Sequence, residues 1–162
     1  MSDISLRIAS PEDDAFCLRV YASTRADEMA LVEWPAPQKE AFLQMQFEAQ
    51  RTHYRTYYPQ AQYYIIERAG QPLGRMIVDR SDRTIRLMDI ALLPEYRHAG
   101  IGSGLIKALL VEADRAGKPV QLHVEPFNPA RQLYERFGFV KTGEVSFYLE
   151  MTRPPKVVEY AG

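Results

Sequence analysis

The chain has 162 residues, of which 46% are hydrophobic and 25% are charged, a composition typical of one folded domain and unlike that of a disordered chain. Twenty Lys and Arg residues against twenty-one Asp and Glu leave a formal net charge of −1. This balance disfavours dedicated nucleic-acid binding, because such proteins usually carry a clear basic excess. The single cysteine, Cys17, excludes an internal disulfide and a cysteine-based zinc site.

The N-terminal sequence has no basic segment followed by an apolar run, and no stretch approaches about 20 apolar residues. We therefore expect a soluble, cytoplasmic protein without a signal peptide and without contact with a membrane. No group of His, Asp and Glu residues has convincing metal-ligand spacing, so we expect no metal.

The first third of the chain predicts one strand and two helices. Residues 4–9 alternate between apolar and polar side chains, which favours a strand. Ser10 and Pro11 then suit the start of a helix that fades near Thr24. Residues 38–57 place apolar side chains three or four apart, which indicates a second helix. The segment between the two helices is rich in proline and shows no clear period.

The middle of the chain predicts three strands, over residues 63–68, 73–79 and 84–93, joined by turns. In the third of these strands the apolar phase shifts near Asp89. A β-bulge would cause such a shift, because one extra residue changes the face that later side chains use. An uninterrupted strand with Asp89 facing solvent is the alternative.

The last third alternates helices with strands. The expected elements are a helix over 102–116, a strand over 120–124, a helix over 128–137, strands over 140–142 and 145–151, and a tail. Hairpins combined with strand–helix–strand crossovers predict an α/β (α+β) fold with a mixed sheet. We expect a mostly antiparallel, twisted sheet of about six to seven strands flanked by about four helices. One domain would span residues 1–153, followed by a flexible tail over 154–162.

The most informative segment is the glycine-rich loop over residues 97–104, between a strand and a helix. Unpaired amides at a helix N-terminus bind anions, and glycines let a ligand approach the backbone closely. The loop therefore suits a phosphate group. A Walker loop is excluded because no Gly-Lys-Ser/Thr follows, and a dinucleotide fingerprint fails because Lys107 stands where its third glycine belongs. A tight turn that merely needs glycine is the remaining alternative.

Two motifs in this sequence resemble those of the GNAT superfamily of N-acetyltransferases. The first matches the family's Gln/Arg-x-x-Gly-x-Gly/Ala signature, and the second its Asn…Leu-Tyr-Glu-x-x-Gly-Phe motif. The two are separated by one helix and one strand, as in the family. The resemblance is specific over residues 73–151 and unspecific over 4–68, and it implies a GNAT-like acyl-CoA N-acyltransferase fold. The matching segments are Arg97-His98-Ala99-Gly100-Ile101-Gly102 and Asn128 to Phe139.

The resemblance implies that acetyl-CoA, or another acyl-CoA, is the acyl donor. Its diphosphate would bind the amides of residues 98–103, its pantetheine arm would lie along residues 90–93, and the Leu92 amide would bind the thioester oxygen. Asn128 would hydrogen-bond that arm, or it would simply cap the helix that follows. The implied cofactor-binding residues are Ile90, Ala91, Leu92, Leu93, Arg97, His98, Ala99, Gly100, Ile101, Gly102, Ser103, Gly104, Asn128 and Tyr134.

Tyr134 matches the family's usual general acid, which protonates the leaving thiolate. Its phenol ordinarily stays protonated at pH 7, and its alternative role is that of a packed aromatic side chain. The general base stays open. His123, Glu125 and Asp89 are the candidates, a structural role is the favoured interpretation of His123, and a chain of water molecules could replace all three.

The resemblance implies direct transfer of an acetyl group from acetyl-CoA to a primary amine of a small molecule or peptide. Glu28, Glu33 and Trp34 are candidates for the acceptor site, with a solvated loop as the alternative for the two acids. Another functional class is a non-catalytic module that binds acyl-CoA or docks on a partner. Dimers are common in the family, and the sequence leaves a homodimer open.

Overall fold

The structure is a computed structural model that describes residues 3–157. In chain order the helices and strands are β1 (Ile4–Ile8), α1 (Asp14–Thr24), α2 (Ala26–Ala30), α3 (Ala36–Tyr57), β2 (Gln62–Arg68), β3 (Gln71–Arg80), β4 (Ile85–Leu92), α4 (Ile101–Ala116), β5 (Val120–Val124), α5 (Ala130–Arg136), β6 (Val140–Val145) and β7 (Tyr148–Arg153). Short 3₁₀ turns at Pro11–Asp13 and Pro94–Tyr96 precede α1 and follow β4.

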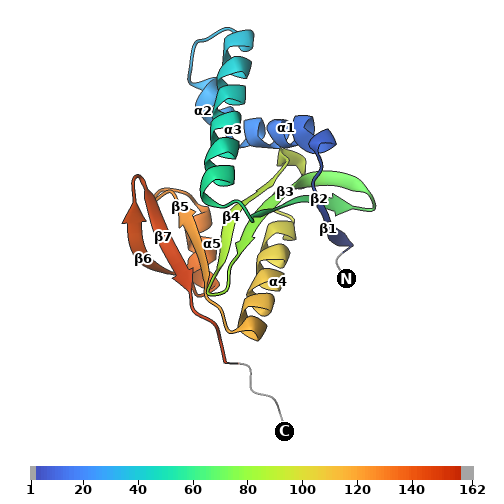
Figure 1. The fold of residues 1–162 in the computed structure, drawn as a ribbon. Coiled ribbons are helices and arrows are strands. Elements are labelled where there is room, and N and C mark those ends of the chain that lie inside the picture. The colour runs from blue at the N-terminus through green and yellow to red at the C-terminus, as the bar shows by residue number, and fades with distance from the viewer. Residues whose placement is uncertain (1–2, 158–162) are drawn as a thin grey trace. The chain divides into compact units, whose positions relative to one another are not determined.

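The seven strands form a sheet in the order β1-β2-β3-β4-β5-β7-β6 (Figure 1). β4 pairs with β5 in parallel, whereas the β1–β2, β5–β7 and β6–β7 pairs are antiparallel. The predicted mixed, mostly antiparallel sheet is confirmed. The short α2 raises the number of α-helices among the described residues to five, one more than the sequence predicts.

Backbone contacts divide the chain into two compact units. The first contains residues up to Ile77 together with Asp89–Gly102, and the second contains Val78–Met88 together with the residues from Ser103 onward. β3 and β4 contribute residues to both units. A single domain over residues 1–153 stays a prediction. Of the predicted tail, 154–157 has no helix or strand and 158–162 lies outside the described residues.

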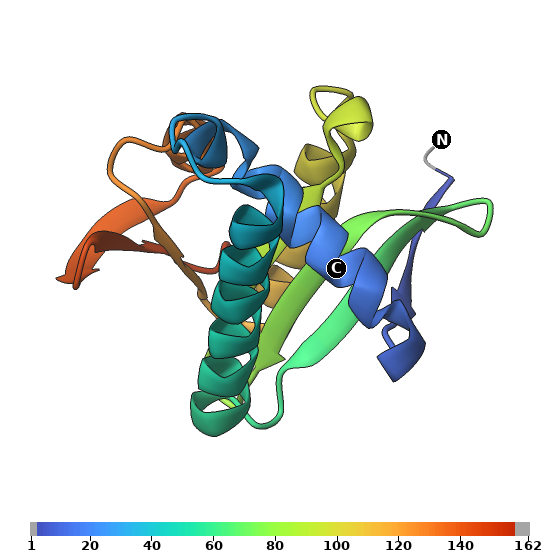
Figure 2. The same ribbon diagram turned by 90° about the horizontal axis from the view of Figure 1, so that it is seen from above.

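In the first unit, α1 and α3 lie over the strands (Figure 2). Val20 and Tyr21 of α1 and Phe47 of α3 are buried against the sheet, and Ile65 and Ile66 of β2 are buried on its two opposite faces, because successive strand residues alternate. Tyr21 and Phe47 meet with ring centroids 5.7 Å apart. Burial of apolar side chains of this size contributes roughly 1.5–3 kcal/mol each, so this cluster anchors both helices.

In the second unit, α4 buries one stripe of side chains. Ile106, Leu109, Leu110 and Ala113 follow the spacing of one helix face and are all buried. Asp114, next along the helix, pairs with the buried Arg153 of β7. The predicted helix over 102–116 is therefore confirmed, with a start one residue earlier at Ile101.

Several element boundaries differ from the predictions by one or more residues. The first helix opens with a 3₁₀ turn, in which the Asp13 carboxylate accepts a hydrogen bond of 2.8 Å from the Ser10 amide. α3 starts at Ala36 because Pro37 is tolerated in the first helical turn. β6 continues to Val145 past a register shift beside Gly143, where the predicted strand ends at 142, and β7 starts only at Tyr148, where the predicted strand starts at 145. The turn between them therefore falls at Ser146, whose φ is 56°, and Phe147.

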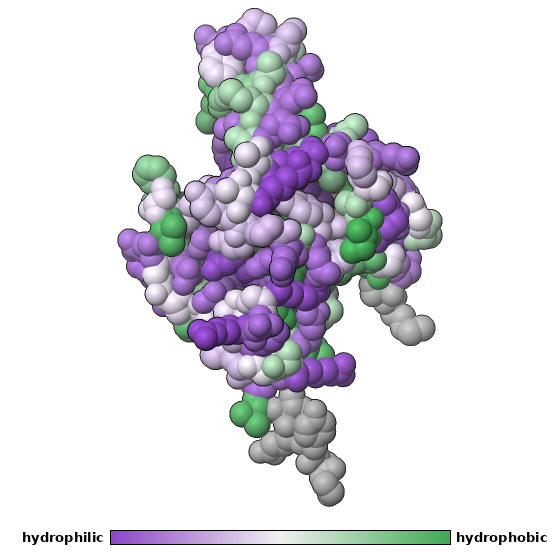
Figure 3. All heavy atoms as spheres, in the orientation of Figure 1, coloured by the Kyte–Doolittle hydropathy of each residue, from purple (hydrophilic) through white to green (hydrophobic). Residues whose placement is uncertain are grey.

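On the face seen in Figure 3, most of the surface is hydrophilic and hydrophobic residues occur in small, separate patches. Phe127 and Phe147 are among the exposed hydrophobic side chains. Within residues 3–157, no helix has both the length and the apolar character needed to cross a bilayer.

Candidate functional site

The glycine-rich loop connects β4 to α4 through two residues in the left-handed backbone region. His98 has a φ of 62° and Gly100 a φ of 82°. Glycine adopts this conformation freely, whereas a non-glycine residue such as His98 costs roughly 1–2 kcal/mol. Strained backbone of this kind is often found at ligand sites, which favours a binding role for the loop over a plain turn.

Gly102 and Gly104 lie in the first turn of α4, where the backbone amides have no partner within the helix. A Cβ atom added at either glycine would meet nothing within 4 Å. The protein's own packing therefore does not require glycine at these positions. An open space over unpaired amides at the positive end of a helix dipole fits a diphosphate, so the residues present suit the implied acyl-CoA donor.

Arg97 uses its side chain inside the protein. Its Nε donates to the Leu92 carbonyl at 2.9 Å, and its Nη2 donates to the Ser23 hydroxyl at 3.1 Å. These bonds tie the loop to the end of β4 and to α1. The Arg97 side chain thus positions the loop, and a role in contacting the donor stays a prediction.

The second half of β4 lies close to β3. An ideal Cβ on Gly74 would come within 2.1 Å of the Ala91 carbonyl oxygen, so only glycine fits at this point of β3. The Leu93 amide donates to the Leu73 carbonyl at 2.9 Å just beyond the strand. The predicted bulge in β4 stays a prediction.

Asp89 is held in an ion pair. Its Oδ2 accepts a hydrogen bond of 2.7 Å from Nε of Arg75, and the side chain of Asp89 is 25% exposed. Asp89 is therefore not simply a solvent-facing side chain, because its carboxylate is partly buried and paired with Arg75. To act as a base through Oδ2, Asp89 would have to give up its bond to the buried Arg75.

Asn128 and Tyr134 belong to the second unit. The Asn128 side chain is exposed, and its Oδ1 accepts a hydrogen bond of 2.9 Å from the Ala130 amide. Asn128 thus has the capping role that the sequence offered as an alternative, while its side-chain amino group has no partner among the described residues. Tyr134, on α5, is half-buried and packs edge-on against Phe139 with ring centroids 5.7 Å apart.

His123 lies on β5 in a polar cluster. Its Nε2 is 3.3 Å from Nη1 of Arg86 and 3.5 Å from Oε2 of Glu150. Burial, and then the charge of Arg86, lower the pKa of His123, and Glu150 only partly opposes them. The imidazole is therefore neutral at pH 7, a form that accepts protons, but its contacts also support the structural role favoured from the sequence. Glu125 is exposed and follows β5 directly.

The three candidate acceptor residues lie in and after α2. Glu28 is exposed and pairs with Arg25 at 3.2 Å, which engages its carboxylate locally. Glu33 is exposed. The Trp34 ring meets the Phe42 ring edge-on with centroids 5.3 Å apart, and the side chain keeps an exposed surface.

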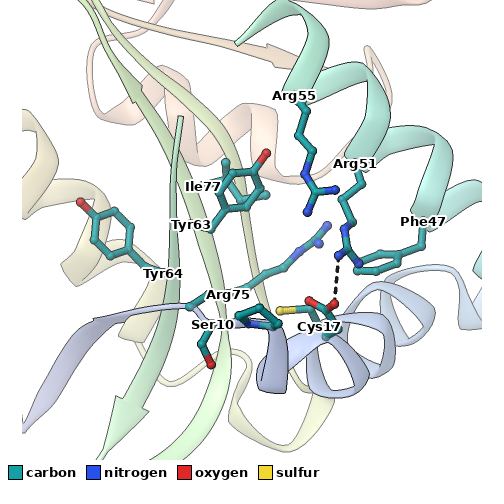
Figure 4. Close-up of a pocket in the computed structure, with 12 residues that line it drawn as sticks. Ser10, Cys17, Phe47, Arg51, Arg55, Tyr63, Tyr64, Arg75 and Ile77 are labelled. Atoms are coloured by element: carbon teal, nitrogen blue, oxygen red, sulfur yellow. Dashed lines mark hydrogen bonds and ion pairs between the residues drawn. The ribbon is translucent and has the colours of Figure 1, made fainter. Parts of the chain in front are cut away.

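The sequence analysis missed a pocket of about 220 Å³ in the first unit (Figure 4). Three arginines line it, Arg51 and Arg55 from α3 and Arg75 from β3. A partial signal for it existed, since Arg51 and Arg55 are one helical turn apart and Arg75 is a charged residue within the apolar run of residues 73–78. Cys17 also lines the pocket, and its pKa is raised by burial, which keeps it a thiol. In the described part of the chain no three His, Cys, Asp or Glu residues form a group able to hold a metal ion.

Comparison with protein families places an acetyltransferase (GNAT) domain over residues 59–141. Two curated relatives, the cysteine-rich protein 2-binding proteins of Mus musculus and Homo sapiens, are each 39% identical over 77 residues. That match covers 46% of this chain and only 10% of either relative, so the likeness concerns one small part of a much longer protein.

Solved structures share the fold. The PaiA N-acetyltransferase from Thermoplasma acidophilum in complex with coenzyme A matches with a TM-score of 0.69 and 17% identity, over 95% of this chain and 99% of that one. Ard1 from Thermoplasma volcanium matches with a TM-score of 0.64 and 21% identity, over 98% and 100% of the two chains. At these identities the likeness establishes the fold alone.

Proposed function

The chain belongs to the GNAT acetyltransferase family, and from this premise we propose that it transfers an acetyl group from acetyl-CoA to a primary amine of a small molecule or peptide. The observation that carries the proposal is the open space over the first turn of α4, where added Cβ atoms at Gly102 and Gly104 would meet nothing. That space, with the strained His98 before it, gives a diphosphate a set of backbone donors.

The donor's binding residues are those that the family motifs assign. The amides of 98–103 bind the diphosphate, and residues 90–93 of β4 accompany the pantetheine arm. The side-chain amino group of Asn128, which has no partner within residues 3–157, is suited to donate a hydrogen bond to that arm, because capping uses only the side-chain oxygen. The coenzyme A held by the PaiA acetyltransferase supports this assignment by analogy of fold.

The reaction requires no covalent enzyme intermediate. The amine nitrogen attacks the thioester carbonyl, the bond from carbon to sulfur breaks, and the acetyl group ends on nitrogen as an amide. Tyr134 donates its phenolic proton to the leaving thiolate. The Leu92 amide stabilises the negative charge that develops on the carbonyl oxygen, a contribution typically worth about 10²–10³ in rate.

Four candidates could accept the proton of the amine, and the contacts of each candidate limit it differently. His123 is neutral at pH 7 but sits between Arg86 and Glu150. Asp89 is bound to Arg75. Glu125 is exposed beyond the end of β5, and a water chain needs no side chain at all. The engagement of His123 and Asp89 is the observation that favours the second candidate function, a module that binds acyl-CoA without transfer.

Two measurements on the same protein separate these functions. Calorimetric titration with acetyl-CoA tests binding, and release of free thiol during incubation with polyamines, amino acids, aminoglycosides and peptides tests transfer. The proposal predicts binding together with thiol release for at least one amine. Binding without thiol release across all four classes would establish the binding module, and absence of binding would refute both.

A further inference from the structure

The arginine pocket lies within the first unit, among α1, α3, β2 and β3. Figure 4 shows Arg51 and Arg55 extending from α3 and Arg75 from β3 toward the same space, with Tyr63 projecting from β2 beside them. None of the residues that line this pocket belongs to the family motifs that we assign to acetyl-CoA. The pocket therefore needs an explanation of its own.

Two of the three arginines have counter-ions. Arg51 pairs with Asp14 at 2.9 Å and with Glu48 at 3.5 Å. Arg75 pairs with Asp89 at 2.7 Å, and its Nη2 donates to the side-chain oxygen Oε1 of Gln50 at 2.8 Å. Both guanidinium groups also lie over the Phe47 ring, 5.5 and 5.4 Å from its centroid. These contacts hold Arg51 and Arg75 in fixed positions.

Arg55 differs from its two neighbours. In the described part of the chain it has no ion pair and no hydrogen bond, although it lines the pocket. Burial raises the pKa of the Tyr63 hydroxyl, and the positive charge of Arg55 partly opposes this rise. Arg55 therefore supplies one unmatched positive charge at the pocket.

The Tyr63 hydroxyl is the second unmatched group. It is buried and has no hydrogen-bond partner in the described residues. A buried hydroxyl without a partner loses its bonds to water and gains nothing in return, so native proteins rarely leave one in that state. A ligand that accepts a hydrogen bond beside Arg55 would satisfy Tyr63 and Arg55 together.

The other residues that line the pocket indicate that the remainder of such a ligand is apolar. Phe47, Ile77, Pro11 and Cys17 give the pocket mostly apolar walls. With a volume of about 220 Å³ the pocket is smaller than the roughly 300–1,000 Å³ typical of sites for drug-sized ligands. A small apolar body carrying one acidic group matches both the walls and the volume.

We propose that this pocket binds a small monocarboxylate with an apolar body, whose carboxylate pairs with Arg55 and accepts a hydrogen bond from Tyr63. A monoanion fits better than a phosphate dianion, because only Arg55 among the three guanidinium groups lacks a counter-ion. Arg75 connects the pocket to Asp89 of β4. The site is additional to the acetyl-CoA site and does not depend on the proposed acetyl transfer.

The test uses benzoate as the probe, benzamide as its neutral counterpart and phenyl phosphate as its dianionic counterpart. Calorimetry or chemical shifts of the Tyr63 ring report binding to the full chain at pH 7.5. We expect saturable binding of benzoate, with benzamide and phenyl phosphate both weaker. Absence of benzoate binding, or equal binding of benzamide, would overturn the proposal, and preference for phenyl phosphate would assign the site to phosphate esters instead.

Three variants locate the site. Arg55→Gln should weaken benzoate binding about tenfold or more, the range for hydrogen bonds to charged groups, and Tyr63→Phe should weaken it by a smaller factor. Arg55→Gln should leave the thermal midpoint of unfolding unchanged, because Arg55 has no partner to lose. Arg83→Gln, an exposed arginine in the turn after β3, is the matched control and should bind as the wild type. Unaltered binding by both pocket variants would contradict the assignment.

Discussion

At the scale of single residues, the proposed chemistry depends most on the phenol of Tyr134. The ring packs against Phe139, so a substitution that keeps the ring should keep the packing. Tyr134→Phe removes only the hydroxyl. We expect the turnover number to fall about 100-fold or more, the usual contribution of a general acid, with acetyl-CoA binding unchanged.

The control for this substitution is Tyr148→Phe, the same change at an exposed tyrosine of β7. It should leave both turnover and binding unchanged. Steady-state kinetics over a broad pH range, with calorimetric titration of acetyl-CoA, measure both quantities. Wild-type turnover of Tyr134→Phe throughout that range would remove Tyr134 as the acid.

The pKa of His123 gives a second prediction at this scale. Burial and Arg86 lower this pKa in the folded protein, whereas the unfolded chain titrates near the ordinary value of about 6.5. Between the two pKa values the unfolded chain binds a proton that the folded chain does not. The free energy of unfolding should therefore rise with pH through this window and stay level, as far as His123 is concerned, above it.

Two measurements check this prediction. The ring signals of His123 should titrate with a midpoint below 6.5 in NMR spectra. Denaturant unfolding at pH 5 and pH 7.5 should show a smaller difference in stability for His123→Gln than for the wild type. A midpoint at or above the ordinary value would show that Glu150 dominates the environment of His123.

At the scale of elements, glycine in the first turn of α4 should lower the stability of the helix and favour the binding of acetyl-CoA. Because a Cβ atom at Gly102 would meet nothing within 4 Å, Gly102→Leu should fold, and the loss of a helical glycine should stabilise it by at most about 0.5–1 kcal/mol, the value for a helix interior. The same side chain would fill the space over the amides. We expect acetyl-CoA to bind at least tenfold more weakly, which corresponds to about 1.4 kcal/mol.

Lys107→Leu is the matched control, an exposed residue further along the same helix. It should leave the affinity for acetyl-CoA unchanged. Thermal unfolding and calorimetric titration of both variants give the two quantities needed. Full affinity in a correctly folded Gly102→Leu protein would contradict the placement of the diphosphate.

The ion pair between Asp114 on α4 and Arg153 on β7 should contribute to stability. Arg153 is 5% exposed, and Nη2 donates to Oδ2 of Asp114 at 3.2 Å. Asp114→Ala leaves a buried guanidinium without its counter-ion, which typically costs about 3–5 kcal/mol. Glu112→Ala breaks the more exposed pair with Arg80 and should cost no more than about 1 kcal/mol.

Denaturant unfolding of the two variants, at the same ionic strength, measures this contrast. Arg153 lowers the pKa of Asp114, so the stabilisation should be present above the ordinary pKa of an aspartate and be lost as the pH falls through the lowered value. Equal costs for Asp114→Ala and Glu112→Ala would indicate that the buried pair contributes no more than a surface pair.

Elements determined by the sequence of their own segment were predicted well, whereas features that depend on contacts between distant segments were not. α4 was predictable because the spacing of its apolar residues marks the buried face. The loop before α4 was predictable because its glycines match a known motif. The β6–β7 turn was predicted too early, between 142 and 145, because β6 continues past a register shift beside Gly143 that the apolar pattern does not reveal. For the arginine pocket the sequence carries only a partial signal, the arginines of α3 and β3, because the residues of α3, β2 and β3 that line it meet only after folding.

At the scale of the whole molecule, the fold and the family are established, while the acceptor and the base are matters of proposal. The seven-stranded sheet with its parallel β4–β5 pair agrees with the mixed, mostly antiparallel sheet predicted from the sequence. The side chain of Arg97 shows how motif and structure complement each other. The motif marks Arg97 as important, and the structure gives it a local reason, the bonds to Leu92 and Ser23.

The central claim is that backbone donors of the loop before α4 hold the diphosphate of the acyl donor. Parallel calorimetric titrations with acetyl-CoA and with acetyl-pantetheine, which has the same thioester but no diphosphate, test it most directly. The account predicts that acetyl-CoA binds at least a hundredfold more tightly, as expected for the loss of several charged hydrogen bonds of about 1.5–3 kcal/mol each. Equal affinities for the two compounds, or no binding of acetyl-CoA, would contradict it.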